Sequence, residues 1–257
     1  MSRAADILRK PIVALLAVTL VIGLFVFRDY GLTWDEPLFY GYANALGYAY
    51  TPANWFSGHF DLSQSYGPSG DDHKNRGPAY LLLAREPVYL LEGLGVDSAS
   101  AWHLLNFLTF LFGVYFVYRL AERLARPWAA TAAAALFAFQ PMLWGHAFIN
   151  PKDMPFLVFF AGAVCLGFRM VDKLVESPFG SAPRQFQHIL LPALLLGIAT
   201  ANRVLGPLAG FLVLAYMIAQ RPPARLQARR GLVPHPVFAE RFSEQIRSGI
   251  PLLWIAS

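Results

Sequence analysis

Uncharged apolar runs of membrane length are the feature that most limits how this chain can fold. They cover Pro11–Phe27, Ala101–Tyr118, Pro127–Asn150 and Met154–Phe168, and a longer run, Gln185–Gln220, is broken only by Arg203. At about 1.5 Å per residue, the first run reaches roughly 25 Å as a helix, enough for the hydrocarbon core once flanking cations snorkel. Only 14% of the residues are charged, against about a quarter in soluble domains. The pattern predicts an all-α, multi-pass transmembrane helical bundle.

The first run could instead belong to a cleaved signal peptide. Such a peptide has an apolar region of about 7 to 15 residues and an A-x-A-like cleavage site after it. The run at 11–27 is longer, and no such site follows it. A retained first helix is therefore the prediction, with a signal peptide as the alternative.

The apolar runs and the charges between them divide the chain into two parts. Residues 1–220 are predicted to form one transmembrane domain with a long outer loop at 28–100. Residues 221–257 are predicted to be a cytoplasmic connector and the start of a further apolar segment, so we expect the chain to be truncated. The expected helices are at about 11–27, 101–118, 128–147, 154–169, 188–202 and 204–220.

Charge is distributed unevenly between the loops, and this predicts the orientation. Basic residues gather after the second and fourth runs, in RLAERLAR (119–126) and at Arg169, Lys173 and Arg184. The 28–100 loop holds nine acidic residues against four Lys or Arg. Cytoplasmic loops are enriched in Lys and Arg, so we expect a protein of the cytoplasmic (inner) membrane with its N-terminus inside and this loop outside. The basic loops account for much of the formal charge of +5, which therefore indicates no nucleic-acid partner.

The 185–220 run allows two paths through the membrane. As a single helix it would be roughly 54 Å long, nearly twice the hydrocarbon thickness, and it would bury Arg203 at a cost of about 3 kcal/mol. Because both ends are basic, we predict a hairpin that turns near ANRVLG (201–206) and places Arg203 outside. One long tilted helix is the alternative.

A second segment, Pro78–Gly95, is also open to two interpretations. It is apolar but has Arg85, Glu86 and Pro87 at its centre. We expect a helix on the outer surface or in the interface. A crossing is the alternative, but it would place the arginines of 119–126 outside.

This topology gathers charged side chains on the outer side. Asp35 and Glu36 follow the first run, Lys152 and Asp153 follow the third, and Arg203 lies at the tip of the last hairpin. Such a set suits a reaction on a lipid-anchored, negatively charged substrate, because cations can bind phosphate and a carboxylate can take up a proton.

The order of these motifs resembles a known family. Trp34-Asp35-Glu36 after the first run, a helix ending in VYRLAERL (117–124) and then GHAFINPKDMPF (145–156) are similar to the phospholipid-carrier-dependent glycosyltransferases. These form glycosyltransferase family 39 of the GT-C superfamily, with protein O-mannosyltransferases and aminoarabinose transferases as relatives. The resemblance spans roughly residues 10–220. It implies a GT-C-type membrane enzyme that moves a sugar, with inversion, from a polyprenyl-phosphate donor to an acceptor hydroxyl on the outer face.

The resemblance also implies roles for individual residues. Asp35 matches the first-loop acidic residue that activates the acceptor, so it is the candidate general base, with Glu36 as its catalytic neighbour. Asp153 matches a second acidic position, where it would orient a cation or the acceptor. The candidate contacts of the donor phosphate are Arg76, which precedes Gly77-Pro78, Arg203 and Lys152.

The same residues also have ordinary interpretations. Asp35-Glu36 fits a solvated loop, Lys152-Asp153 a polar turn, and Arg203 an interfacial cation. Aromatic residues that fit an interfacial belt are Trp34, Tyr40, Tyr42 and Trp55. The histidines that are too scattered for a metal motif, and that fit packing or hydrogen bonding, are His73, His103 and His146. Because relatives differ in metal use, the resemblance leaves a divalent metal ion open as a cofactor.

Two alternative functions remain beside transfer of a sugar. One is a non-catalytic fragment of such an enzyme. The other is a transporter or lipid-binding membrane protein. Against a transporter, the charges gather at one membrane face, whereas transporter sites usually lie near the middle of the membrane.

Overall fold

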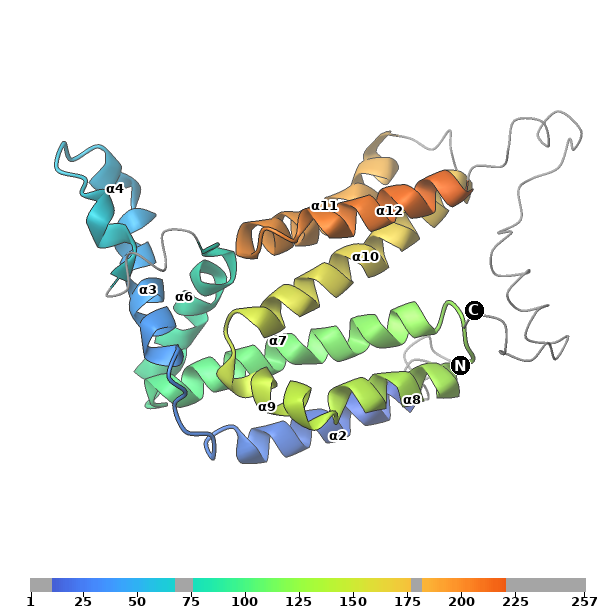
Figure 1. Ribbon diagram of the computed structural model, residues 1–257, viewed down its shortest axis with the longest axis horizontal. Coiled ribbons are helices and arrows are strands. Elements are labelled where there is room, and N and C mark those ends of the chain that lie inside the picture. The colour runs from blue at the N-terminus through green and yellow to red at the C-terminus, as the bar shows by residue number, and fades with distance from the viewer. Residues whose placement is uncertain (1–10, 68–75, 177–181, 221–257) are drawn as a thin grey trace, which may run out of the picture.

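The chain folds into helices throughout the part that the structure describes. A computed structural model describes residues 11–67, 76–176 and 182–220. Within these ranges there are α-helices and one 3-10 helix but no strand, which confirms the predicted all-α fold (Figure 1). The predicted connector at 221–257 and His73 lie outside the described residues.

Proline sets the start of several helices. It occupies the first turn of α3, α4, α8 and α9, where its missing N–H would have no helical partner. The helices are α2 (Pro11–Val26), α3 (Glu36–Ala49), α4 (Pro52–Trp55), the 3-10 helix η1 (Leu62–Ser65), α6 (Ala79–Gly93), α7 (Ser98–Ala121), α8 (Pro127–Ala138), α9 (Pro141–Ile149), α10 (Asp153–Glu176), α11 (Ala182–Asn202) and α12 (Pro207–Gln220).

Two of the described helices, α7 and α10, are long and apolar enough to cross a membrane. The pair α8 and α9 makes a third candidate span that is bent by 63°. The single helix expected at 128–147 is therefore two helices. The first ends at Ala138, and Gln140 starts the second, because its side chain accepts a hydrogen bond from the Leu143 N–H and caps α9, which Pro141 begins. Helix α2, the described part of α11, and α12 are shorter apolar helices.

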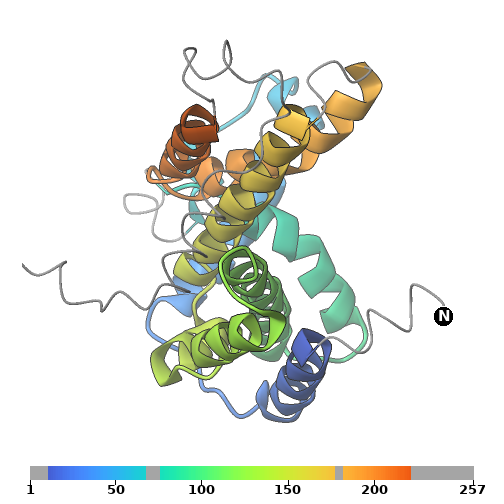
Figure 2. The same cartoon turned by 90° about the vertical axis from the view of Figure 1, so that its right-hand side faces the viewer.

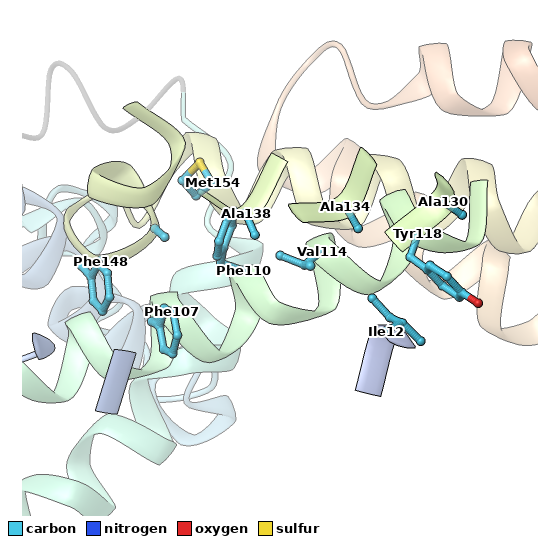
Figure 3. Packing of buried hydrophobic residues seen from close by; sticks show 11 residues of the cluster. Ile12, Phe107, Phe110, Val114, Tyr118, Ala130, Ala134, Ala138, Phe148 and Met154 are labelled. Atoms are coloured by element: carbon cyan, nitrogen blue, oxygen red, sulfur yellow. The ribbon is translucent and has the colours of Figure 1, made fainter. Parts of the chain in front are cut away.

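The largest core cluster surrounds α7. Phe107, Phe110, Val114 and Tyr118 are buried along this helix (Figure 3). Three alanines of α8 are completely buried against it, at positions 130, 134 and 138. Residues four apart share one helix face, and small side chains there let two helices approach closely.

Helix α10 packs against α7 on one side and against α11 and α12 on the other (Figures 1 and 2). Close approach to α12 needs Gly167, because a Cβ at this position would overlap Val213. Helices α11 and α12 run back along α10 as a hairpin whose turn lies at Arg203–Gly206.

The segments with the predicted site residues lie at one end of the bundle. The α9–α10 turn, the α11–α12 turn, the segment preceding α3 and residues 76–78 before α6 are all found there, towards the left in Figure 1. The segment between α2 and α7 contains helices α3, α4 and α6 and the 3-10 helix η1. Of these, α6 packs on α3, α7 and α11.

Candidate functional site

A cavity of about 270 Å³ lies where the start of α3 meets the α9–α10 turn. From the first segment it is lined by Thr33, Trp34, Asp35 and Phe39. From the second it is lined by His146 and residues 149–153. The cavity therefore joins the two sequence motifs, Trp34-Asp35-Glu36 and the NPKD stretch, that the sequence singled out separately.

The start of α3 presents Asp35 to this cavity. Helix α3 begins at Glu36, and Asp35 occupies the N-cap position without a side-chain capping bond. Its side chain is exposed and has no hydrogen bond or ion pair with any described residue. The Asp35 carboxylate is thus accessible to a molecule in the cavity, as a general base must be.

The neighbouring Glu36 is in a different environment, since its side chain is completely buried. Its Oε2 accepts hydrogen bonds from the backbone N–H and the hydroxyl of Thr33, at 2.6 and 2.8 Å. Its Oε1 accepts one from the Tyr40 hydroxyl at 2.6 Å and lies 2.7 Å from Nε2 of His103. Burial raises the pKa of Glu36, but these hydrogen bonds outweigh burial, so the pKa lies below its ordinary value of 4.5.

His103 connects this carboxylate to the rest of the bundle. It is a completely buried residue of α7. While Nε2 contacts Glu36, Nδ1 lies 3.3 Å from the carbonyl oxygen of Phe27, just beyond α2. One imidazole therefore ties together the end of α2, the start of α3 and the interior of α7, immediately beside Asp35.

The NPKD stretch is a turn that Asn150 holds in place. Its Oδ1 accepts hydrogen bonds from the backbone N–H groups of Lys152 and Asp153, at 3.1 and 2.7 Å. Asn150 thereby caps the N-terminus of α10. Its side-chain nitrogen lies 3.3 Å from Asp153 Oδ2 and 3.3 Å from His146 Nδ1. The cap fixes the backbone from which Lys152 and Asp153 reach the cavity.

The α11–α12 turn docks onto this stretch. Arg203 forms an ion pair with Asp153. Next to it, the Asn202 side-chain amide donates a hydrogen bond to the Lys152 carbonyl at 3.2 Å. The buried Nε of Arg203 has no hydrogen-bond partner among the described residues. Three of the predicted site residues, Lys152, Asp153 and Arg203, are therefore in one contact network.

Arg76, a further predicted site residue, lies near Lys152 because both side chains contact the Phe39 ring. The guanidinium carbon of Arg76 lies 5.6 Å from the centre of the Phe39 ring, and Nζ of Lys152 lies 5.8 Å from it. Burial lowers the pKa of Lys152, the charges of Arg203 and Arg76 lower it further, and Asp35 raises it. Burial, followed by the charge of Arg76, also lowers the pKa of Arg203. The three cations thus form one electrostatically coupled group.

The structure also adds residues that the sequence did not assign to the site. Phe39 lines the cavity and lies beneath two cations, and Trp34 lines it although 90% of its surface is exposed. His146 lines the cavity as well. His103 does not line it but contacts Glu36, the residue next to Asp35. In the described part of the chain, no group of three or more His, Cys, Asp or Glu side chains could hold a metal ion.

One protein-family model matches the chain. Its description is dolichyl-phosphate-mannose-protein mannosyltransferase, and it matches residues 89–233, more than half of the 257 residues. The chain belongs to this family. No curated protein and no solved structure gives a match to this mannosyltransferase-family chain.

Membership of the mannosyltransferase family confirms the resemblance found in the sequence and identifies the chain as a membrane glycosyltransferase of GT-C type. The matched segment begins in α6 and includes α7 to α12. It contains the α9–α10 and α11–α12 turns, and therefore Lys152, Asp153 and Arg203. Asp35, Glu36 and Arg76 precede it.

Proposed function

We propose that this chain transfers a sugar from a polyprenyl-phosphate donor to an acceptor hydroxyl, with inversion, in the cavity beside Asp35. The observation that carries the proposal is that the accessible carboxylate of Asp35 shares a cavity with Lys152, to which Arg203 and Arg76 are electrostatically coupled. The reaction joins a phosphate-bearing donor to a hydroxyl-bearing acceptor, so it needs cations and a base close together.

Asp35 is the general base in this proposal. Its carboxylate takes the proton of the acceptor hydroxyl while the acceptor oxygen forms a bond to the anomeric carbon of the sugar. The bond from that carbon to the donor phosphate oxygen breaks, and its electron pair remains on the phosphate. Polyprenyl phosphate leaves as a phosphate monoester, and attack from the opposite face inverts the anomeric centre.

The cations stabilise the charge that develops on the leaving phosphate. The pKa of Lys152 is lowered first by burial and then by the positive charges of Arg203 and Arg76, so these two cations lie close enough to repel it. A bound phosphate relieves this repulsion, and the relief is greatest when the full negative charge of the leaving group has formed. Asp153 holds Arg203 through their ion pair and so orients its guanidinium.

Glu36 acts as a positioning residue for Asp35. Its carboxylate is occupied by Thr33, Tyr40 and His103 and is completely buried, so it supports the backbone from which Asp35 projects. The sequence assigned Glu36 to the catalytic pair. We now propose that it contributes through the geometry of α3.

The proposal places the cavity on the outer side of the cytoplasmic membrane, with the N-terminus inside. Charge supports this orientation, because the ends of α7 and α10 away from the cavity carry basic residues. Such residues mark cytoplasmic ends. The donor is then a lipid of the same membrane, and the acceptor approaches from outside.

The test is to incubate the purified full chain, in vesicles, with radiolabelled mannosyl phosphopolyprenol and an extract of the molecules found outside the cytoplasmic membrane, which contains candidate acceptors. The family description names dolichyl-phosphate-mannose, so mannose is the first sugar to try. The proposal predicts release of free polyprenyl phosphate together with labelled acceptor. Sugar taken up into the vesicles with intact donor would instead identify a transporter. If the labelled donor stays intact with every acceptor extract, the proposed transfer reaction is contradicted.

A further inference from the structure

A second cavity lies at the opposite end of α10 and has a different composition. Its volume is about 360 Å³, and it lies between the last turns of α7 and of α10. Six of its lining residues carry charge, four of them positive and two negative, which gives a net charge of +2. These residues are Arg119, Arg123, Arg169, Lys173, Glu122 and Asp172.

Ion pairs neutralise one part of this lining. Arg123 binds Asp172 through two hydrogen bonds of 2.8 and 3.3 Å, and the Tyr216 hydroxyl contacts both side chains. Arg119 pairs with Glu122 at 3.4 Å. These pairs form a neutral wall that links α7, α10 and α12.

The excess positive charge comes from two residues one turn apart on α10. Arg169 is exposed and has no ion pair with any described residue. Lys173 contacts Glu176 at 2.6 Å, but Glu176 does not line the cavity. The cavity therefore presents one unpaired guanidinium and a neighbouring ammonium, a set suited to an anionic oxygen group.

The position of this cavity along α10 relates it to the membrane. Arg169 follows Asp153 by sixteen positions, or about 24 Å of helix, close to the hydrocarbon thickness of roughly 30 Å. The catalytic cavity and this one thus lie near opposite membrane surfaces. Deeper in the bilayer, the lining continues as Tyr115, Cys165 and Leu166, which suit the glycerol and acyl part of a lipid.

We infer that this cavity binds the phosphate group of an anionic ligand, with Arg169 and Lys173 as its contacts. Basic pockets between transmembrane helices suit lipid head groups, and the apolar depth of this one fits an amphiphile. A phosphate can come from an anionic membrane lipid or from a soluble phosphate ester. Either ligand would present the same phosphate to Arg169 and Lys173, but only a lipid would also contact the apolar lining.

The experiment measures binding of phosphatidic acid to the purified full chain by native mass spectrometry, with phosphatidylcholine, a zwitterion of zero net charge, as the lipid for comparison. The double variant Arg169→Gln, Lys173→Gln should bind phosphatidic acid about 30-fold more weakly, from the usual contribution of two cations at a membrane surface. The charge-matched control is Arg28→Gln, Arg126→Gln, because both residues are exposed and line neither cavity. It should bind as the wild type does. The charge-conserving variant Arg169→Lys, Lys173→Arg should also retain binding.

Competition with glycerol 3-phosphate shows whether the bound phosphate belongs to a lipid or to a soluble ester. A lipid occupant is shown if phosphatidic acid is not displaced by millimolar glycerol 3-phosphate. Displacement at equal affinity would assign the site to a soluble phosphate ester. Equal weakening in the two neutralised double variants, or no weakening in either, would overturn the site.

Discussion

Arg203 and Asp153 form an ion pair across 50 positions of sequence, and this pair joins the α11–α12 turn to the first turn of α10. The side chains are 33% and 54% exposed, so solvent screening limits the contribution of the pair to stability to at most about 1 kcal/mol. Its consequence is geometric. It holds a guanidinium beside Lys152 at the edge of the cavity.

Neutralising Arg203 should therefore impair catalysis more than stability. Arg203→Gln removes a cation that we propose stabilises the leaving phosphate, and loss of one such group typically lowers kcat by about 10²- to 10³-fold. The measurement is single-turnover release of polyprenyl phosphate, together with the thermal unfolding midpoint. Arg28→Gln is the matched control, because it removes an equivalent exposed charge that neither lines the cavity nor pairs with a residue that lines it. Equal activity in the two variants would rule out contact with the phosphate.

Glycine at position 77 is required by a close backbone approach. A Cβ there would overlap the carbonyl oxygen of Ala201 at the end of α11. Gly77→Ala should push the segment that carries Arg76 away from the α11–α12 turn, lowering both the unfolding midpoint and the transfer rate. Gly31→Ala is the control, since nothing lies within 4 Å of a Cβ at that position. A wild-type midpoint in Gly77→Ala would show that the two segments are not in contact.

The Glu36–His103 contact should make stability depend on pH in the acidic range. Because the pKa of folded Glu36 is lowered, its stabilisation is fully present above its ordinary value of 4.5 and is lost as pH falls through the lowered value. Hydrogen bonds to a charged group typically contribute about 1.5 to 3 kcal/mol each, so Glu36→Gln should unfold at a lower temperature near neutral pH. The difference from wild type should shrink below pH 4.5. A difference that is the same at every pH would argue against an ionised Glu36.

The orientation of the α11–α12 turn can be tested with a cysteine. The turn residue Val204 is 90% exposed, whereas Asn202, two positions earlier, is only 6% exposed and donates a hydrogen bond to the Lys152 carbonyl. In a Cys165→Ser background, Val204→Cys should react with an impermeant thiol reagent in intact cells. Leu124→Cys, 58% exposed at the other end of the bundle, should react only after lysis. The reverse pattern would invert the proposed topology.

The sequence was sufficient to predict the apolar helices but not their ends. Helix α10 continues to Glu176, eight residues beyond Phe168, where the uninterrupted uncharged run ends. Charged side chains can extend a helix out of the bilayer and pair along it, as Lys173 and Glu176 do. The bend between α8 and α9 was missed for the opposite reason. No charge marks it, and its only signal was Gln140-Pro141, an N-cap followed by a proline.

The membrane topology predicted from the sequence was enough to group the site residues at one end of the molecule, but not to predict their contacts. The expected hairpin and the expected loops put Asp35, Lys152 and Arg203 at one end of the molecule, and the structure has them there. The Glu36–His103 contact could not be foreseen, because 67 positions separate the two residues. Local sequence also gives no sign that one of two adjacent carboxylates is exposed and the other completely buried.

The central claim, that Asp35 is the general base, is tested most directly by the rate of polyprenyl phosphate release in Asp35→Asn. Asp29→Asn is the matched control, because Asp29 is exposed on the same connection between α2 and α3 but does not line the cavity. General-base catalysis usually contributes about 10²- to 10⁴-fold. We predict a loss of that size in Asp35→Asn, with wild-type unfolding, and none in Asp29→Asn. Release at the wild-type rate in Asp35→Asn would contradict the account.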